Sequence, residues 1–260
     1  MYSKEELLQD ITPRLIGGKL FVFESIDSTN TCGKTLAEAG IGEGTVVFAD
    51  HQTAGKGRNG RTWLSEPGSN LLFSVVVRPE LPKDQTSFLT FYSAVSIARA
   101  VELVIGHAVE CKWPNDFLLN SRKFCGILLE SSFGRSKLDY SVIGVGVNVN
   151  QQAFNGEMRH PVTSLSLEEK TRFDIKQLFQ KIVLSLDELY VDVQSRNFQT
   201  IMKEWNSRCS MFGKPVTVER AHDRLSGTAI GLSADGGLMI ETPEGTSTVY
   251  AGDVSILQES

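Results

Sequence analysis

The sequence contains few cysteines and no cysteine motif. The four cysteines, Cys32, Cys111, Cys125 and Cys209, form no CxxC pair and have no pair of histidines close by in the sequence. Structural zinc sites need closely spaced ligands, and small disulfide-bonded folds need many paired thiols. The sequence therefore indicates neither a zinc site nor a disulfide framework.

Long hydrophobic runs are also lacking. No apolar run is expected to approach the roughly 20 residues that a membrane-spanning helix needs. The first residues, MYSKEELLQD, lack the apolar core of a signal peptide. We therefore expect a cytoplasmic protein that does not associate with a membrane.

An excess of positive charge is missing as well. The chain has 26 lysines and arginines against 31 acidic residues, which gives a formal net charge of −5. This balance argues against a protein whose main task is to coat nucleic acid, although a local basic loop can still bind an anion. With 260 residues, 41% of them hydrophobic, the chain can form one large domain, alone or with a small appendage.

The residue pattern divides the chain into a mixed body and an all-β tail. Strands are expected at 19–25, 45–50, 70–79, 109–112, 123–132 and 139–150, and helices at 28–40, 86–105 and 173–193. After Phe212 the pattern changes to short strands separated by turn clusters such as SADGG and TPEG. We therefore expect an α+β body at 1–211, with a mixed sheet packed by helices, and a small β-barrel at 212–260.

A flexible basic loop follows the strand expected at 45–50. The stretch HQTAGKGRNGRTW combines three glycines, three cations and an indole: Gly55, Lys56, Gly57, Arg58, Gly60, Arg61 and Trp63. Glycine lets backbone N–H groups approach an anion, and arginine adds a planar pair of donors. The loop matches neither a Walker loop nor a dinucleotide fingerprint. It indicates an oxyanion site, and the alternative is a surface loop with solvated charges.

Three further segments carry candidate ligand-binding residues. In KWPND, Pro114 stiffens a turn that presents Asn115 and Asp116, and a carboxylate there could hold Mg²⁺ beside phosphates. Lys123 begins an apolar strand in which Gly126 would permit close approach of a ligand. Asn148 ends the strand GVGVNVN, where its amide could pair with a base. A stiff turn, an edge lysine and an ordinary strand end are the alternatives.

Together these four segments resemble the catalytic domain of biotin protein ligases (biotin–[acetyl-CoA-carboxylase] ligases). That family has a GRGRRGR-type loop ending in Trp, then KWPND, then a Lys…Gly strand, then a glycine-rich strand ending in Asn. The order is the same here, and DSTN (27–30) precedes it. Lys56 and Asn59 stand where the family usually has arginine, and Leu257 stands where a family ending often carries arginine.

The resemblance implies a fold, a reaction and partners. The fold is a class II synthetase-like catalytic domain with an SH3-like C-terminal barrel. The reaction uses ATP, biotin and Mg²⁺ to form biotinyl-5′-AMP, and then transfers biotin to a lysine of a biotin carboxyl carrier protein. Because little sequence precedes Lys19, against the roughly 50 residues of a domain, we expect the monofunctional type, which lacks the DNA-binding domain and binds no DNA. A homodimer through sheet edges is also expected.

The resemblance also assigns roles to individual residues. Lys123, Arg58 and Arg61 would be catalytic, and Asp116 would serve the metal. The implied biotin contacts are Ser28, Thr29, Asn30, Gln52, Gly55, Lys56, Gly57, Arg58, Lys123 and Gly126. The implied ATP or adenylate contacts are Arg58, Arg61, Trp63, Asn115 and Asn148.

Two other functions remain open from the sequence. A lipoate-protein ligase performs the same chemistry on a related fold, although the loop ending in Trp63 favours biotin. A nucleotide-binding or nucleic-acid-binding module without catalysis is the second alternative, and the net charge of −5 argues against it.

Overall fold

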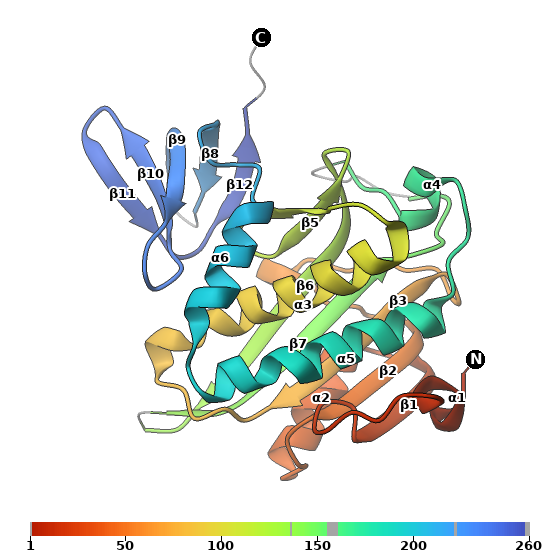
Figure 1. Cartoon of the computed structure of the whole chain (residues 1–260). Coiled ribbons are helices and arrows are strands. Elements are labelled where there is room, and N and C mark those ends of the chain that lie inside the picture. The colour runs from red at the N-terminus through yellow and green to blue at the C-terminus, as the bar shows by residue number, and fades with distance from the viewer. Residues whose placement is uncertain (1, 136, 155–160, 221–222, 258–260) are drawn as a thin grey trace.

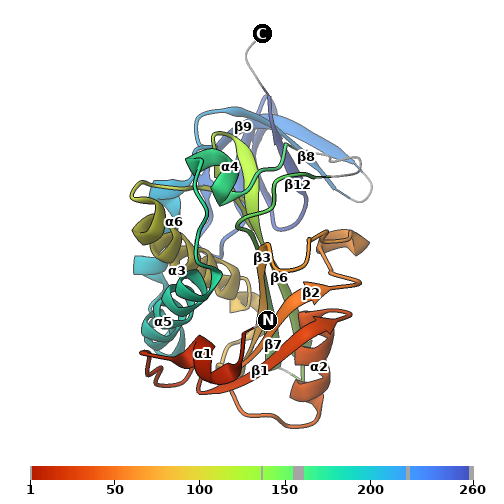
Figure 2. The ribbon, with the colours of Figure 1, turned by 90° about the vertical axis from the view of Figure 1, so that its right-hand side faces the viewer.

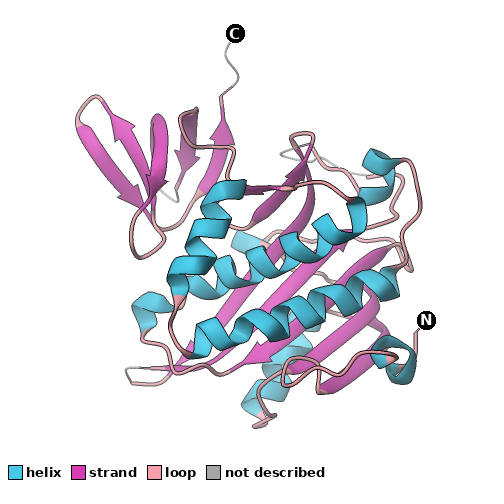
Figure 3. Ribbon diagram, in the orientation of Figure 1, coloured by secondary structure: helices cyan, strands magenta, loops and turns pink. Residues whose placement is uncertain are grey.

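The large sheet has seven strands and is mixed (Figures 1 and 3). The computed structural model describes residues 2–135, 137–154, 161–220 and 223–257. The strands are β1 (Lys19–Ile26), β2 (Thr45–Gln52), β3 (Asn70–Val77), β4 (Glu110–Lys112), β5 (Asp116–Leu119), β6 (Arg122–Phe133) and β7 (Leu138–Asn148). Their order is β1-β2-β3-β7-β6-β5-β4. Only the β1–β2 pair among these neighbours is parallel, and the other described pairs are antiparallel.

Helices cover both faces of this sheet. They are α1 (Lys4–Leu8), α2 (Thr29–Glu38), α3 (Phe88–Ile105), α4 (Leu165–Glu169), α5 (Ile175–Gln194) and α6 (Phe198–Arg208), with short 3₁₀ turns η1 (Arg58–Gly60) and η2 (Lys83–Gln85). Figure 2 shows α3 and α5 along one face of the sheet and α2 on the opposite face. The main core lies between the sheet and α3/α5, where Phe179 meets Phe48 and Phe73 edge to face.

Helix α3 is the apolar centre of this core. It ends at Gly106, whose left-handed φ of 84° suits glycine at a helix C-terminus. The segment Lys83–Ile105 is long and apolar enough to cross a membrane by length and composition, so the expectation that no run approaches a membrane span is wrong. In the structure 67% of that window is buried inside the protein. A helix buried in this way is a core element.

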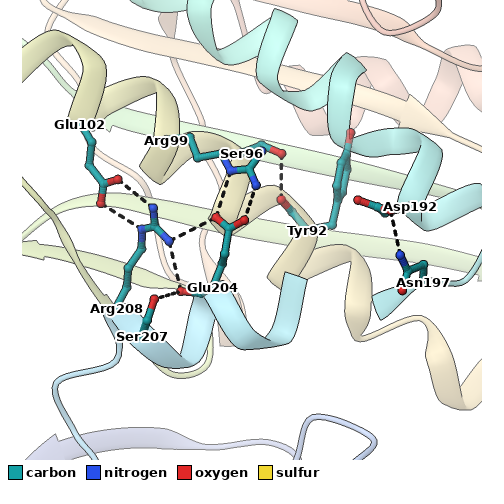
Figure 4. A network of polar contacts seen from close by, with 9 residues as sticks. All are labelled: Tyr92, Ser96, Arg99, Glu102, Asp192, Asn197, Glu204, Ser207 and Arg208. Carbon is teal, nitrogen blue, oxygen red and sulfur yellow. Dashed lines mark hydrogen bonds and ion pairs between the residues drawn. The ribbon is translucent and has the colours of Figure 1, made fainter. Parts of the chain in front are cut away.

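The small C-terminal sheet is attached to the body through α6. Figure 4 shows a network in which Arg99 Nε donates to Glu204 at 3.0 Å and Arg208 Nη2 donates to Glu102 at 2.8 Å. Trp205 is 1% exposed and packs edge to face against Phe91. These contacts fix α6 on α3 and therefore fix the start of the C-terminal sheet.

The C-terminal strands form an antiparallel sheet in the order β11-β10-β9-β8-β12. They are β8 (Pro215–Glu219), β9 (Arg224–Leu232), β10 (Leu238–Thr242), β11 (Gly245–Val249) and β12 (Asp253–Ile256). The expected all-β tail is confirmed. The pairings within the described residues do not join β11 to β12, so a closed barrel is not observed there. The division at residue 212, which lies between α6 and β8, stays a prediction.

The expected strands and long helices of the body are present, with ends shifted by a few residues. Three helices, α1, α4 and α6, were not expected from the sequence. In α6 the buried residues Phe198, Ile201 and Trp205 follow helical spacing. That signal is weak because the remaining positions are mostly polar.

Candidate active site

A pocket opens on the α2 face of the large sheet. It is bordered by the start of α2, the basic loop at 56–63, the β4–β5 turn, the centres of β6 and β7, and the start of β12. These segments lie far apart in the sequence, and the sheet order places them side by side. The basic loop therefore faces KWPND and the Lys123 strand across one cavity.

Most residues that the sequence singled out line this pocket. They are Ser28, Thr29, Asn30, Gln52, Lys56, Gly57, Arg58, Arg61, Trp63, Asn115, Asp116, Lys123 and Gly126. Gly55 and Asn148 do not line it. Their predicted ligand contacts, like the roles of all these residues, stay predictions.

The floor of the pocket is made of glycine backbone. Gly126 on β6 lies directly opposite Gly146 on β7, and Gly144 lies opposite Ser74 on β3. A Cβ atom on Gly146 would come within 2.5 Å of the Trp63 ring, and one on Gly126 within 3.1 Å. The sequence reasoning took Gly126 as a site residue and missed Gly144 and Gly146. The alternating glycines of GVGVN were the available signal, because residues two apart in a strand share a face.

Trp63 covers this glycine floor. Its ring centroid lies 5.5 Å from Lys123 Nζ, which is a cation–π distance. Its Nε1 is buried and has no hydrogen-bond partner among the described residues. Leaving a buried donor unpaired costs about 1–3 kcal/mol. A ligand that supplied an acceptor here would remove that cost.

The site cations contact acceptors within the protein. Lys123 Nζ lies 2.6 Å from Asp116 Oδ1. Arg58 donates to Asn115 Oδ1 at 3.1 Å and to the Gly252 carbonyl at 3.3 Å. Burial lowers the pKa of the Arg58 guanidinium, with partial compensation from the nearby carboxylates, and arginine still keeps its charge.

Arg61 pairs with the C-terminal sheet. Its Nη1 donates to Asp253 Oδ1 at 3.3 Å, and its Nη2 contacts the other carboxylate oxygen. Trp113 Nε1 donates to the Gly236 carbonyl at 3.2 Å, so KWPND also contacts this sheet. Asp253 was not expected beside the site, because no local pattern connects it to the loop. Trp113 lies within KWPND, but no role was predicted for it.

A buried polar network forms the end of the pocket near α2. The Thr29 backbone N–H donates to Gln52 Oε1 at 2.7 Å. Asn30 Nδ2 donates to Glu130 Oε2 at 2.8 Å, and Ser74 Oγ lies 2.6 Å from Asn30 Oδ1 and 2.7 Å from Thr29 Oγ1. The DSTN segment therefore presents amide and hydroxyl groups in fixed positions.

The basic loop has its own internal order. Trp63 N donates to the Gly55 carbonyl at 2.9 Å, and a Cβ on Gly55 would come within 2.5 Å of the Trp63 carbonyl. Gly55 therefore closes the base of the loop. Asn59 has φ of 55°, a left-handed conformation that asparagine tolerates better than most residues. This conformation gives a structural reason for asparagine at a position where the family pattern has arginine.

Asn148 lies at the end of β7, away from the pocket lining. It is 4% exposed, and its Nδ2 donates to the Thr163 carbonyl at 3.0 Å. Its Oδ1 is buried and has no hydrogen-bond partner among the described residues. The predicted contact of Asn148 with the nucleotide stays a prediction.

The residues present fit a metal that arrives with a nucleotide. The described ranges contain no cluster of three or more His, Cys, Asp or Glu side chains that could hold an ion. Asp116 offers one carboxylate, at present paired with Lys123. Mg²⁺ is commonly held by one or two carboxylates together with substrate phosphates and water. Asp116 meets that requirement.

Comparison with known proteins identifies the family. The model of the "Biotin/lipoate A/B protein ligase family" matches residues 22–148, and that of the "Biotin protein ligase C terminal domain" matches residues 211–257. The chain is 33% identical to a bifunctional ligase/repressor BirA from Bacillus spizizenii, over 98% of this chain and 79% of that protein. It is 29% identical to a biotin–[acetyl-CoA-carboxylase] ligase from Paracoccus denitrificans, over 88% and 96%.

Solved structures agree with this result. A biotin protein ligase from Aquifex aeolicus in complex with biotin and ATP has a TM-score of 0.79 and 28% identity, covering 93% of this chain and 100% of that one. A biotin protein ligase from Leishmania major in complex with biotinyl-5-AMP has a TM-score of 0.60 and 25% identity, covering 90% and 99%. Sequence and fold together place this chain in the biotin protein ligase family.

Proposed function

We propose that this chain activates biotin with ATP as biotinyl-5′-AMP and transfers the biotinyl group to a lysine of a biotin carrier protein. The supporting observation is the convergence of the basic loop, KWPND and the Lys123–Gly126 strand on one glycine-floored pocket. A cavity with a polar end and a cationic end suits an acid whose head carries hydrogen-bonding groups and whose tail ends in a carboxylate.

The first step joins two anions, so the site must offset their repulsion. The biotin carboxylate attacks the α-phosphorus of MgATP, and pyrophosphate leaves. One cation about 4 Å from one anion contributes about 4 kcal/mol at an effective dielectric constant near 20. Lys123 holds the carboxylate and then the acyl-phosphate bridge, while Arg58 and Arg61 hold phosphate oxygens.

Substrate binding requires an exchange of acceptors. The biotin carboxylate replaces Asp116 beside Lys123, and phosphate oxygens replace Asp253 beside Arg61. Asp116, once free of Lys123, would be the residue that holds the Mg²⁺ of MgATP, with Asn115 beside it. The chemistry that such an ion would supply is neutralisation of phosphate charge.

The two ends of the intermediate contact different residues. The DSTN residues Ser28, Thr29 and Asn30, together with Gln52, bind the ureido head of biotin. Gly126 lets the acyl chain lie against β6, and the loop residues Gly55, Lys56 and Gly57 close over it. The adenine side contacts Trp63, Asn115 and Asn148.

The second step needs no covalent intermediate on the enzyme. The ε-amine of the acceptor lysine attacks the acyl carbon, an amide forms and AMP leaves. Cys111 and Cys125 are poor nucleophiles because burial raises the pKa of both thiols. The loop excludes water from the acyl-adenylate until the acceptor arrives.

The same proposal extends to the acceptor protein, the cellular compartment, the oligomeric state and DNA binding. The acceptor is the biotin carboxyl carrier domain of acetyl-CoA carboxylase, and the reaction takes place in the cytoplasm. The chain forms a homodimer through an edge of the large sheet, where β1 and β4 are the outer strands. It binds no DNA. Light scattering after gel filtration tests the dimer, and a gel shift with duplex DNA tests the last point.

Transfer of labelled biotin to a purified carrier domain tests the function directly. Label should appear on the carrier only when ATP is present, and a carrier with its acceptor lysine changed to arginine should stay unlabelled. ATP–pyrophosphate exchange driven by biotin and not by lipoate separates biotin ligation from lipoate ligation. Exchange driven by lipoate alone would overturn the assignment of biotin.

A further inference from the structure

Glu130 lies at the start of a chain of hydrogen bonds that ends at the substrate pocket. Its carboxylate on β6 accepts from Asn30 Nδ2 at 2.8 Å, and the same nitrogen is 3.4 Å from the Leu128 carbonyl. Glu130 does not line the main pocket but borders an adjoining one with the basic loop. It is therefore placed to act on the pocket through Asn30.

The carboxylate is the closer of the two acceptors that set which way the Asn30 amide faces, and the Leu128 carbonyl is the other. An ionised carboxylate can only accept hydrogen bonds, so it draws the amide nitrogen to itself and turns the oxygen away. That oxygen, Oδ1, lies 2.6 Å from Ser74 Oγ. Because an amide oxygen cannot donate, the Ser74 hydroxyl hydrogen must point at Asn30.

The orientation of the Ser74 hydroxyl in turn sets the direction of its hydrogen bond with Thr29. Ser74 Oγ is 2.7 Å from Thr29 Oγ1, and its only hydrogen is committed to Asn30. Ser74 can then only accept from Thr29. The other acceptor near the Thr29 hydroxyl is Gln52 Oε1, at 3.1 Å, which already accepts from the Thr29 backbone N–H, so the hydroxyl hydrogen goes to the closer Ser74. Ser74 is 0% exposed, and Asn30 and Thr29 are each 3% exposed, so water does not readily replace these partners.

We propose that Glu130 is a positioning residue that fixes the donor and acceptor pattern of Asn30, Ser74 and Thr29 for a cyclic urea head. Such a head carries both N–H donors and a carbonyl acceptor. A pocket in which the hydrogen-bond donors and acceptors of these side chains were not fixed would bind it less well. The inference rests on the proposed function, because it assumes that the DSTN residues bind the head of biotin. Glu130 itself touches no reacting atom.

Two substitutions separate acceptor loss from shape change. Glu130→Gln keeps an acceptor, since its amide can turn its oxygen towards Asn30, and should leave the KM for biotin within about threefold of the wild type. Glu130→Leu removes the acceptor and should raise that KM about tenfold, the effect of one lost hydrogen bond in a buried network. In both variants kcat and the KM for ATP should change less than threefold. Glu188→Ala, at an exposed carboxylate on α5, controls for loss of charge.

A double-mutant cycle with Asn30→Ala gives the decisive readout. If Glu130 acts through Asn30, adding Glu130→Leu to Asn30→Ala raises the KM for biotin no further. Additive increases would show an independent structural role and overturn the inference. If Glu130→Leu does not fold, Glu130→Asp takes its place, because the shorter side chain withdraws the carboxylate from Asn30.

The wild-type assay separates this inference from the proposed function. If the wild type catalyses biotin-driven pyrophosphate exchange but the double-mutant cycle gives additive effects, only the role of Glu130 is rejected. Absence of exchange in the folded wild type rejects the proposed function and this inference with it.

Discussion

Arg61 of the basic loop pairs with Asp253 of β12, a residue 192 positions further along the chain, with Nη1 donating to Oδ1 at 3.3 Å. Arg58 adds a second link, to the Gly252 carbonyl at 3.3 Å. The C-terminal segment that contains β12 therefore contacts the loop through two arginines, Arg58 and Arg61. Under the proposed function, phosphate oxygens would compete with Asp253 for Arg61.

Replacing Asp253 with asparagine should loosen the loop in the free enzyme. The Arg61 side chain is 43% exposed, and an ion pair of this kind contributes about 0.2–1 kcal/mol. We expect limited trypsin cleavage at Lys56–Arg61 to become up to about fivefold faster. Biotin with ATP should suppress cleavage in both proteins, because the loop then covers the intermediate.

Asp223→Asn is the matched control for this experiment. Asp223 pairs with Arg220 within the C-terminal sheet and does not contact the loop. Its cleavage rate should equal that of the wild type. Equal rates for Asp253→Asn would show that the ion pair does not restrain the loop, and equal cleavage with and without ligands would reject the loop as a cover.

Replacing Lys123 with alanine should abolish adenylate formation without unfolding the protein. The lysine Nζ supplies the cation expected to hold the biotin carboxylate, and its loss leaves Asp116 beside that anion. We expect biotin-dependent pyrophosphate exchange to fall at least about a hundredfold. Circular dichroism should show the wild-type fold, and Lys137→Ala, at an exposed lysine, should keep normal exchange. Near-normal exchange in Lys123→Ala would remove Lys123 from the mechanism.

Adding a methyl group to the pocket floor should impair biotin binding. A Cβ at Gly146 would lie 2.5 Å from Trp63 Cε2, so the indole must shift into the space needed by the acyl chain. We expect Gly146→Ala to raise the KM for biotin more than about tenfold, the scale of a 1–3 kcal/mol overpacking cost. Gly42→Ala, where a Cβ meets nothing within 4 Å, should bind biotin normally. An unchanged KM for Gly146→Ala would place the acyl chain elsewhere.

The His107–Glu169 pair should make stability depend weakly on pH. The hydrogen bond from His107 Nε2 to the Glu169 carboxylate, at 2.8 Å, raises the pKa of His107 above its usual value. A raised pKa in the folded state means that the contribution is complete below the unfolded pKa, near 6.5, and is lost as the pH rises through the folded pKa. Because His107 is 51% exposed, the contribution is about 0.5 kcal/mol.

Urea unfolding at pH 5.5 and pH 8.5 measures this effect. The free energy of unfolding of wild type should exceed that of His107→Ala by more at pH 5.5 than at pH 8.5. Glu169→Gln should remove most of the same pH dependence, since it removes the partner. If the difference in free energy of unfolding between the two proteins were larger at pH 8.5 than at pH 5.5, the expected direction of the pH dependence would be wrong.

The sequence alone predicted most strands and the long helices of the body, and it singled out candidate anion-binding residues; α1, α4, α6 and β5 were not expected. Apolar periodicity located the strands and the long helices because each buries one face or stripe. Some site residues could be predicted because their chemistry is local. The loop glycines give flexibility, KWPND gives a rigid turn, and Lys123 gives a positive charge. Periodicity did not predict α6, because only three of its residues form its buried face.

The tertiary structure decided how these pieces form one site. The register between β6 and β7 sets Gly126 opposite Gly146 and leaves room for Trp63. This pairing cannot be predicted from the spacing of residues in the sequence. The approach of β12 brings Asp253 to Arg61. The packing of α2 against the large sheet brings Asn30 to Ser74 and Glu130. Each is a contact between distant segments, fixed by how the sheets and helices pack rather than by any local pattern.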